Sequence, residues 1–116
     1  MRYLFILKQS PYHSSLAREA LDFALASAAF DQQVSLLFMG DGLFQLIKNQ
    51  QSVNGKKNIE KTLNSLSLFE IENIYYSDSC AQMRGLQYDQ FSIKTKQATH
   101  QDIQTLLNSS DRVFNF

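Results

Sequence analysis

Short apolar runs alternate with helix-patterned segments along the chain, and this alternation restricts the possible folds more than any other feature. Runs rich in branched and aromatic residues, typical of buried strands, cover residues 2–7, 34–39, 71–76, 91–96 and 112–116. Helical patterns lie between them, over residues 16–30, 43–47, 59–69, 77–83 and 99–107. This order predicts a three-layer α/β fold with a mostly parallel sheet between helices. We expect residues 1–116 to form a single domain, because no linker, repeat or low-complexity segment interrupts the pattern.

The ends of two predicted helices carry capping signals, and one helix has an unusually wide apolar surface. Ser14 or Ser15 suits the N-cap of helix 16–30, and Thr99 with Asp102 forms a capping-box-like pair for the last helix. Helix 16–30 is rich in alanine and apolar over most of its circumference. Two interpretations stay open for it: an internal helix buried on all sides, or a helix that also packs against another subunit. Asn54-Gly55 predicts a turn in the polar stretch before the next helix.

The charges are balanced, with 11 basic and 11 acidic residues, which argues against a strongly basic nucleic-acid-binding protein. No apolar run approaches the roughly 18 residues that span a bilayer, and the first residues lack a secretory signal pattern. We therefore expect a cytoplasmic protein without membrane contact. Cys80 is the only cysteine, which excludes an intrachain disulfide and a cysteine-based zinc site.

Ligands of open parallel sheets collect at the carboxyl ends of the strands, where three predicted loops fall. These loops cover residues 8–15, 40–42 and 77–85, and none has the glycine spacing of a dinucleotide or triphosphate site. Ser10, Ser14 and Ser15 leave open a phosphate-binding loop of flavodoxin type, and hence a small-molecule-binding module; helix capping is the simpler interpretation. No nucleophile elbow supports a hydrolase.

His13 and His100 are the only histidines, and no carboxylate cluster surrounds either of them in the sequence. Metal sites need several such ligands together. We expect no metal and no cofactor.

Cys80 is the one side chain suited to sulfur chemistry. It falls in the first turn of the predicted helix 77–83, where the helix N-terminus favours a thiolate, while Asp78 nearby opposes it. A small apolar residue packed against the sheet is the alternative interpretation.

Several segments together resemble the DsrE/DsrF-like sulfur-relay family, most closely its TusC-type subunits. The segment Gly40-Asp41-Gly42-Leu43-Phe44-Gln45-Leu46 is similar to a D-G-V-F-Q-L sequence of that family. Pro11 followed by residues 17–22 resembles the first loop and helix. Further matches are residues 68–72, Arg84-Gly85-Leu86 and the final residues 111–116. The resemblance implies a flavodoxin-like, DsrE/DsrF-like fold.

The resemblance also implies a role in a cytoplasmic TusBCD-type complex. Such a complex is a heterohexamer that passes persulfide sulfur from TusA towards TusE, and the sulfur ends in 2-thiouridine at the tRNA wobble position. The implied direct partners are TusB-like and TusD-like subunits, with TusA and TusE as indirect ones. Direct contact with tRNA is not expected.

In that family the carrier cysteine lies in the TusD subunit, seven residues before the Arg-Gly pair that follows the third strand. Counting back from Arg84 gives Ser77, and a serine hydroxyl cannot form a persulfide. We therefore expect a non-catalytic subunit with no catalytic residue. Helix 16–30 and residues 43–47 are the predicted packing faces for partner chains. A persulfide-carrying sulfurtransferase that uses Cys80 is the alternative.

Overall fold

The computed structural model describes residues 1–12, 14–48 and 59–116. Its core is a five-stranded sheet with the order β4-β3-β2-β1-β5, in which every strand pairing is parallel. The strands are β1 (Arg2–Leu7), β2 (Gln33–Phe38), β3 (Asn73–Ser77), β4 (Lys96–Ala98) and β5 (Arg112–Asn115). The α-helices are α1 (Leu16–Ala29), α2 (Ile59–Asn64), α3 (Asp78–Met83) and α4 (His100–Ser109), and the 3-10 helices are η1 (Gly40–Leu46), η2 (Leu66–Phe69) and η3 (Tyr88–Gln90). The predicted α/β fold with a parallel sheet is confirmed.

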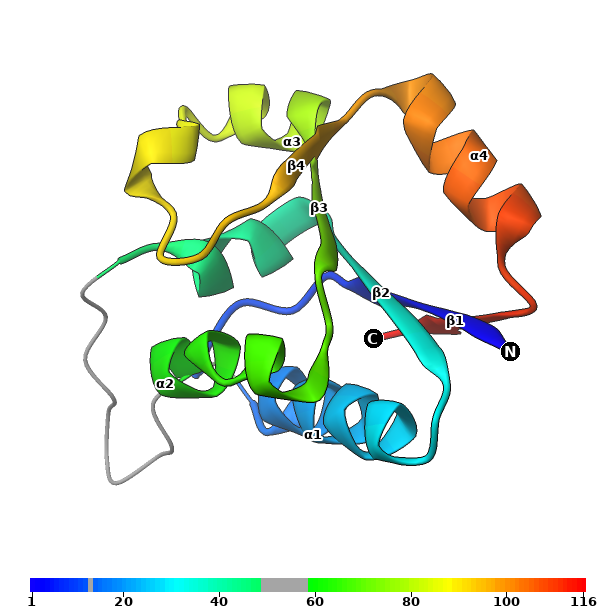
Figure 1. The fold of residues 1–116 in the computed structure, drawn as a ribbon. Coiled ribbons are helices and arrows are strands. Elements are labelled where there is room, and N and C mark those ends of the chain that lie inside the picture. The colour runs from blue at the N-terminus through cyan, green and yellow to red at the C-terminus, as the bar shows by residue number, and fades with distance from the viewer. Residues whose placement is uncertain (13, 49–58) are drawn as a thin grey trace.

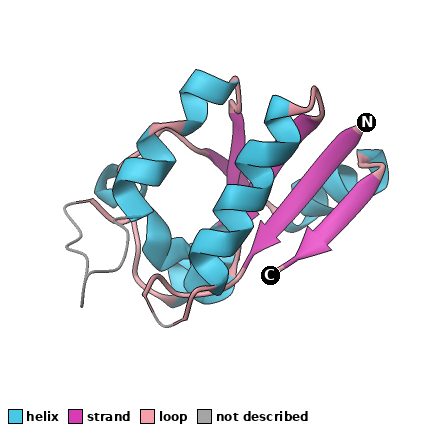
Figure 2. Ribbon diagram, turned by 90° about the horizontal axis from the view of Figure 1, so that it is seen from below, coloured by secondary structure: helices cyan, strands magenta, loops and turns pink. Residues whose placement is uncertain are grey.

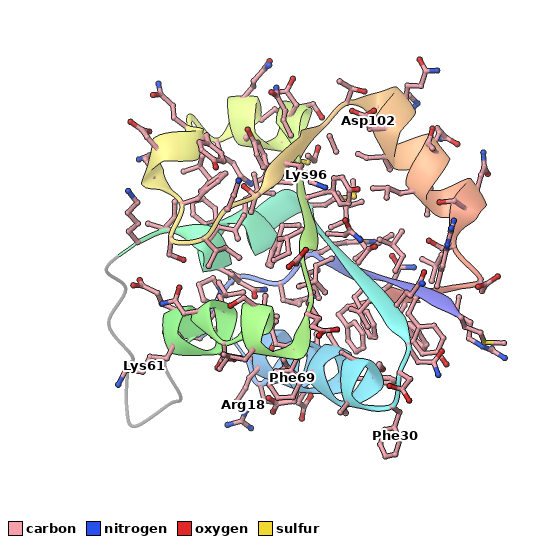
Figure 3. The ribbon with its side chains drawn as sticks, viewed as in Figure 1. Arg18, Phe30, Lys61, Phe69, Lys96 and Asp102 are labelled. Atoms are coloured by element: carbon pink, nitrogen blue, oxygen red, sulfur yellow. The ribbon has the colours of Figure 1, made fainter. Side chains whose placement is uncertain are left out.

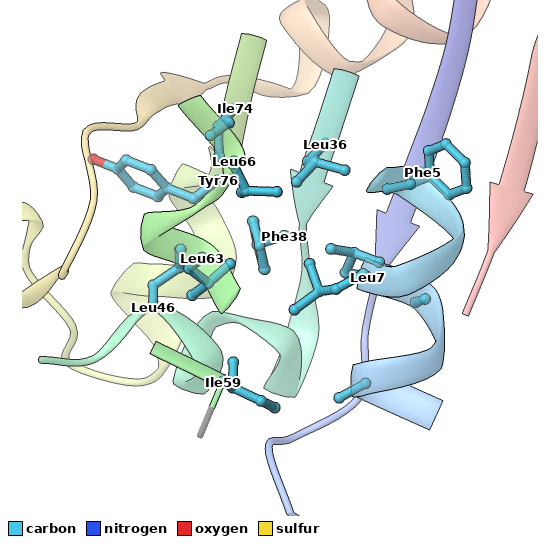
Figure 4. Packing of buried hydrophobic residues seen from close by; sticks show 14 of the residues in the cluster. Phe5, Leu7, Leu36, Phe38, Leu46, Ile59, Leu63, Leu66, Ile74 and Tyr76 are labelled. Atoms are coloured by element: carbon cyan, nitrogen blue, oxygen red, sulfur yellow. The ribbon is translucent and has the colours of Figure 1, made fainter. Parts of the chain in front are cut away.

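The two faces of the sheet are covered to different degrees. Figure 1 shows α1 and α2 on one side and α4 on the other. The side chains of Phe5, Leu36 and Phe38 are fully buried between the sheet and the first of these layers (Figure 4). On the other face the buried cluster is smaller and, among the described residues, consists of Leu4, Ile6, Leu37 and Ala98. The first face therefore holds most of the apolar surface that stabilises the fold.

Helix α1 is buried along one stripe and is not the fully internal helix that its composition allowed. Its buried positions are small or apolar: Ala17, Ala20, Leu21, Ala24 and Ser27. Leu16 and Phe23 are about two-fifths exposed, and Phe30, just after the helix, is 79% exposed. Figure 3 shows Phe30 projecting away from the rest of the chain at the carboxyl end of α1.

The caps predicted for the helices are confirmed in one case and corrected in the other. Thr99 Oγ1 accepts a hydrogen bond from Asp102 N–H, and the Asp102 carboxylate accepts one from Thr99 N–H, so α4 begins with the expected capping box. Ser15 occupies the N-cap of α1 but its side chain makes no capping bond. The Ser14 hydroxyl instead accepts a hydrogen bond from Leu16 N–H.

The prediction of a strand over residues 91–96 is wrong, because β4 contains only Lys96–Ala98. Phe91 instead forms an isolated bridge with Ile47, and Ser92 N–H donates to the carbonyl of Leu46. The Phe91 ring packs edge-on against Tyr76, with 5.0 Å between ring centroids. These contacts hold the segment against η1 and leave a cavity of about 640 Å³ beside the start of β3. Tertiary packing thus overrides the alternating sequence pattern.

The surface expected on residues 43–47 also needs correction. Leu43, Gln45 and Leu46 are completely buried, and Phe44 is 37% exposed. This segment is mainly part of the core and offers little area to a partner. The predicted Asn54-Gly55 turn lies outside the described residues.

Candidate functional site

The candidate site lies at the carboxyl end of the sheet, where the segments after β1, β2 and β3 come together. Parallel strands end at the same edge, so Gln9, η1 and α3 are neighbours although they are far apart in sequence. The fold therefore gathers the three loops that the sequence indicated. Contacts between η1 and the other two segments define the geometry.

Two glycines allow η1 to pass close to the end of β1. Gly40 has a φ of +53°, in the left-handed region that favours glycine. A Cβ atom placed on Gly42 would lie 2.0 Å from the carbonyl oxygen of Leu7, so only glycine fits at this point. The side chain of Gln45 then donates a hydrogen bond of 2.8 Å to the Gln9 carbonyl. These interactions fix η1 against the loop that follows β1.

An ion pair joins η1 to α3. Arg84 Nε and Nη2 each lie 3.1 Å from Asp41 Oδ1. Arg84 Nη1 also donates to the Cys80 carbonyl at 3.2 Å, which satisfies a backbone acceptor of α3. Two of the segments that resemble the DsrE/DsrF-like family, at residues 40–46 and 84–86, are therefore in direct contact. Arg84 therefore links the segments that follow β2 and β3.

Ser77 lies at the end of β3, is 1% exposed, and is the N-cap residue of α3. This hydroxyl accepts a hydrogen bond from Cys80 N–H at 3.3 Å, and it lies 3.3 Å from the hydroxyl of Ser79. Ser77 is therefore the N-cap of α3, and its side chain is committed to the start of this helix.

Cys80 lies in the first turn of α3, as the sequence predicted, and is half-buried with its side chain packed against the main core cluster. Burial raises the pKa of its thiol. Hydrogen bonds from Ser77, Gly40 N–H and Ser79, together with the positive charge of Arg84, outweigh burial and hold the pKa below its ordinary value. The surroundings of Cys80 therefore make its thiol easier to ionise than an ordinary cysteine.

The charged side chain that acts on the Cys80 thiol is not the one that the sequence indicated. Asp78 was expected to oppose the thiolate, but its carboxylate accepts a hydrogen bond from Gln82 and acts on Tyr76. Burial, and then the charge of Asp78, raise the pKa of the Tyr76 hydroxyl. The charge that acts on Cys80 is that of Arg84.

The other residues singled out in the sequence lie apart from this arrangement or outside the described residues. His100 is exposed at the start of α4, and His13 lies outside the described residues. Across residues 1–12, 14–48 and 59–116, no group of three or more histidine, cysteine or acidic side chains is placed to hold a metal. No helix in this part of the chain is long and apolar enough to cross a membrane.

Sequence reasoning missed the Asp41–Arg84 pair and the contact between Gly40 and Cys80. Both depend on β2 and β3 being neighbours, which the chain order alone does not give. A usable signal was present, because the Asp-Gly and Arg-Gly pairs each follow a predicted strand at its carboxyl end.

Comparisons with known proteins agree on one family and one fold. The sequence model described as the DsrE/DsrF-like family matches residues 1–116. A TusC homolog of Pseudomonas aeruginosa is 36% identical over 95% of this chain and 93% of its own length. The intracellular sulfur oxidation protein DsrF of Allochromatium vinosum is 31% identical, over 99% of this chain and 96% of its own length. The crystal structure of the ychN protein from E. coli has a TM-score of 0.88 at 19% identity, covers 100% of this chain and 99% of its own, and shows the shared fold.

Proposed function

This chain belongs to the DsrE/DsrF-like family, and from that premise we propose that it is a non-catalytic subunit of a TusBCD-type sulfur-relay complex. The complex is cytoplasmic and contains TusB-like and TusD-like partners. It passes persulfide sulfur from TusA towards TusE, and the sulfur is used for 2-thiouridine at the tRNA wobble position. The similarity to TusC homologs over nearly the whole chain supports this assignment.

The proposal rests on Ser77, a buried residue without sulfur that stands where the sulfur-bearing subunit has its carrier cysteine. The resemblance places the carrier cysteine of the sulfur-bearing subunit at this position, seven residues before Arg84-Gly85. Persulfide formation needs an accessible thiolate. Ser77 has no sulfur and is almost completely buried, and its hydroxyl caps the N-terminus of α3. This chain therefore contributes structure at the position where its proposed partner carries sulfur.

A second candidate function is favoured by the environment of Cys80. Ser77, Gly40, Arg84 and Ser79 lower the pKa of its thiol, which is the property of a sulfur-accepting cysteine. Its half-buried position and its packing against the core favour the structural role. In the second candidate, the Cys80 thiolate attacks the outer sulfur of a donor persulfide, accepts that sulfur, and releases the donor as a thiolate.

Assembly tests the first candidate. The chain is mixed with TusB-like and TusD-like subunits from the same source and analysed by size-exclusion chromatography with light scattering. We expect one defined complex that contains all three chains. A chain that elutes separately from both partners would contradict the proposal.

Intact-mass spectrometry separates the two candidates. The folded chain is incubated with a persulfide donor, beside a Cys80→Ser variant as the matched control. The structural role predicts no added sulfur on either protein. A gain of one sulfur that Cys80→Ser abolishes would establish the carrier role instead.

A further inference from the structure

The cavity of about 640 Å³ lies at the start of β3, at the opposite end of this strand from Ser77 and the candidate site. Figure 2 shows α1 beside α2 and η2 on one face of the sheet. Residues of α2 and η2 line the cavity, together with residues 71–74, 92–94 and Lys96. Its volume falls within the range of about 300–1,000 Å³ that is typical of small-molecule sites. The cavity is therefore a candidate ligand site separate from the surroundings of Cys80.

The floor of the cavity is apolar and comes from the main core. Leu63 of α2, Leu66 of η2, Ile71 and Ile74 line it, and each of these side chains is at most 5% exposed. Ile93 on the opposite wall is half-buried and packs against the same core cluster. An alkyl chain placed on this floor would leave water for an apolar surface, which is favourable.

The wall formed by residues 92–96 is polar and carries an excess of positive charge. Lys94 and Lys96 both line the cavity, whereas Glu72 is the one acidic residue that lines it. The Lys96 ammonium lies 3.5 Å from Oδ1 of Asn73, which also lines the cavity. The hydroxyl of Ser92 is buried and has no hydrogen-bond partner among the described residues, so a donor on this wall is unused. These groups favour an anionic head group over a cationic one.

We propose that this cavity binds a small anionic amphiphile of the medium-chain carboxylate type. Its alkyl chain lies on the apolar floor, and its head group lies at the wall of residues 92–96. The cavity exists because this wall leaves the sheet before β4 begins at Lys96. The inference is independent of the proposed sulfur-relay function, since the cavity and Cys80 lie at opposite ends of β3.

Isoleucine methyl groups report directly on the cavity in an NMR titration of the unmodified chain with sodium octanoate. Ile71, Ile74 and Ile93 line the cavity, whereas Ile6 and Ile103 belong to the cluster on the other face of the sheet and are internal controls. We expect saturable shifts of the first three methyl groups, with a dissociation constant of about 1 mM for so small a ligand. The two control methyl groups should stay in place.

A series of related ligands separates the contribution of the alkyl chain from that of the charge. Octanoate should bind about tenfold more tightly than hexanoate, because two further methylene groups leave water. Octylammonium has the same chain and the opposite charge, and it should bind at least about threefold more weakly than octanoate.

Lysine variants locate the head group. Lys94→Gln and Lys96→Gln each remove one positive charge from the wall, and at least one of them should weaken octanoate binding about threefold. Lys61→Gln is the matched control, because Lys61 is an exposed lysine of α2 that does not line the cavity. This control should bind octanoate as the unmodified chain does.

Three outcomes overturn the proposal. The first is the absence of shifts at Ile71, Ile74 and Ile93 at roughly 20 mM octanoate, well above the expected dissociation constant. The second is equal shifts at these residues and at Ile6 and Ile103, which would mean non-specific association. The third is octylammonium binding as tightly as octanoate, or both wall variants binding as tightly as Lys61→Gln, because either result would exclude recognition of an anion.

Discussion

Gly42 is the residue where a single added methyl group should damage the site most. A Cβ atom at this position would lie 2.0 Å from the Leu7 carbonyl oxygen and 2.7 Å from its carbon, both of them backbone atoms of β1. Ordinary van der Waals contacts of a Cβ atom lie at 3.4–4 Å, and contacts below 3.0 Å are essentially never seen. Since β1 is paired on both sides, the strand cannot yield, and η1 must shift by about 1 Å or more. The Gly42→Ala variant therefore separates η1 from the sheet.

The expected cost follows from what moves with η1. Leu43 and Leu46, which follow Gly42 in η1, are completely buried, so a shift of η1 loosens core packing. Overpacking of a core typically costs about 1–3 kcal/mol. We expect Gly42→Ala to lower the free energy of unfolding by about 3 kcal/mol. Urea denaturation measures this change when the unchanged chain and the variant have the same m-value.

Gly85→Ala is the matched control for this prediction. Gly85 has a φ of +65°, and nothing lies within 4 Å of an added Cβ, so this change carries backbone strain without a clash. That strain costs about 1–2 kcal/mol. If Gly42→Ala destabilises the chain no more than Gly85→Ala does, the result would contradict the close approach of Gly42 in η1 to Leu7 in β1.

The remaining predictions concern the cap of α4 and the groups around Cys80. Thr99→Ala should lower the free energy of unfolding by about 1 kcal/mol in thermal or urea denaturation, because it removes one bond of the capping box; an unchanged midpoint would contradict the cap. Asp41→Asn should cost less than about 1 kcal/mol in urea denaturation, because the Asp41 side chain is 62% exposed and its ion pair is solvated. Arg84→Met should raise the pKa of the Cys80 thiol towards its ordinary value, as followed by thiolate absorbance against pH, and an unchanged titration curve would refute the role of the Arg84 charge. The pKa of the Cys80 thiol is lower in the folded chain than in the unfolded chain, so the Cys80 thiolate stabilises the folded state. This stabilisation is complete above the unfolded pKa and is lost as pH falls through the folded pKa. Urea midpoints measured across that interval should show a rise that Cys80→Ser abolishes.

Segments with strong local signals were predicted well from the sequence. The continuous apolar run at residues 2–7 is β1, and Thr99 with Asp102 forms the capping box of α4. Cys80 falls in the first turn of α3 because Ser77 is a good N-cap. In each case a few neighbouring residues decide the structure, so the sequence carries the information locally.

Features that depend on tertiary contacts were not predicted. Residues 91–95 alternate like a strand but are held by Phe91 against Ile47 and Tyr76. The pairing of Asp41 with Arg84 requires β2 and β3 to be adjacent, which chain order does not specify. The candidate site lies where such contacts meet, so its electrostatics could be obtained only from the structure.

We propose that this chain supplies structure, and not a sulfur-bearing thiol, to a relay complex. The most direct test replaces Cys80 with serine in the assembled complex and measures the rate at which sulfur passes from donor to acceptor. We predict a rate equal to that of the unmodified complex, because no sulfur passes through this subunit. Loss of transfer in a complex that still assembles would contradict the claim and would identify Cys80 as a carrier.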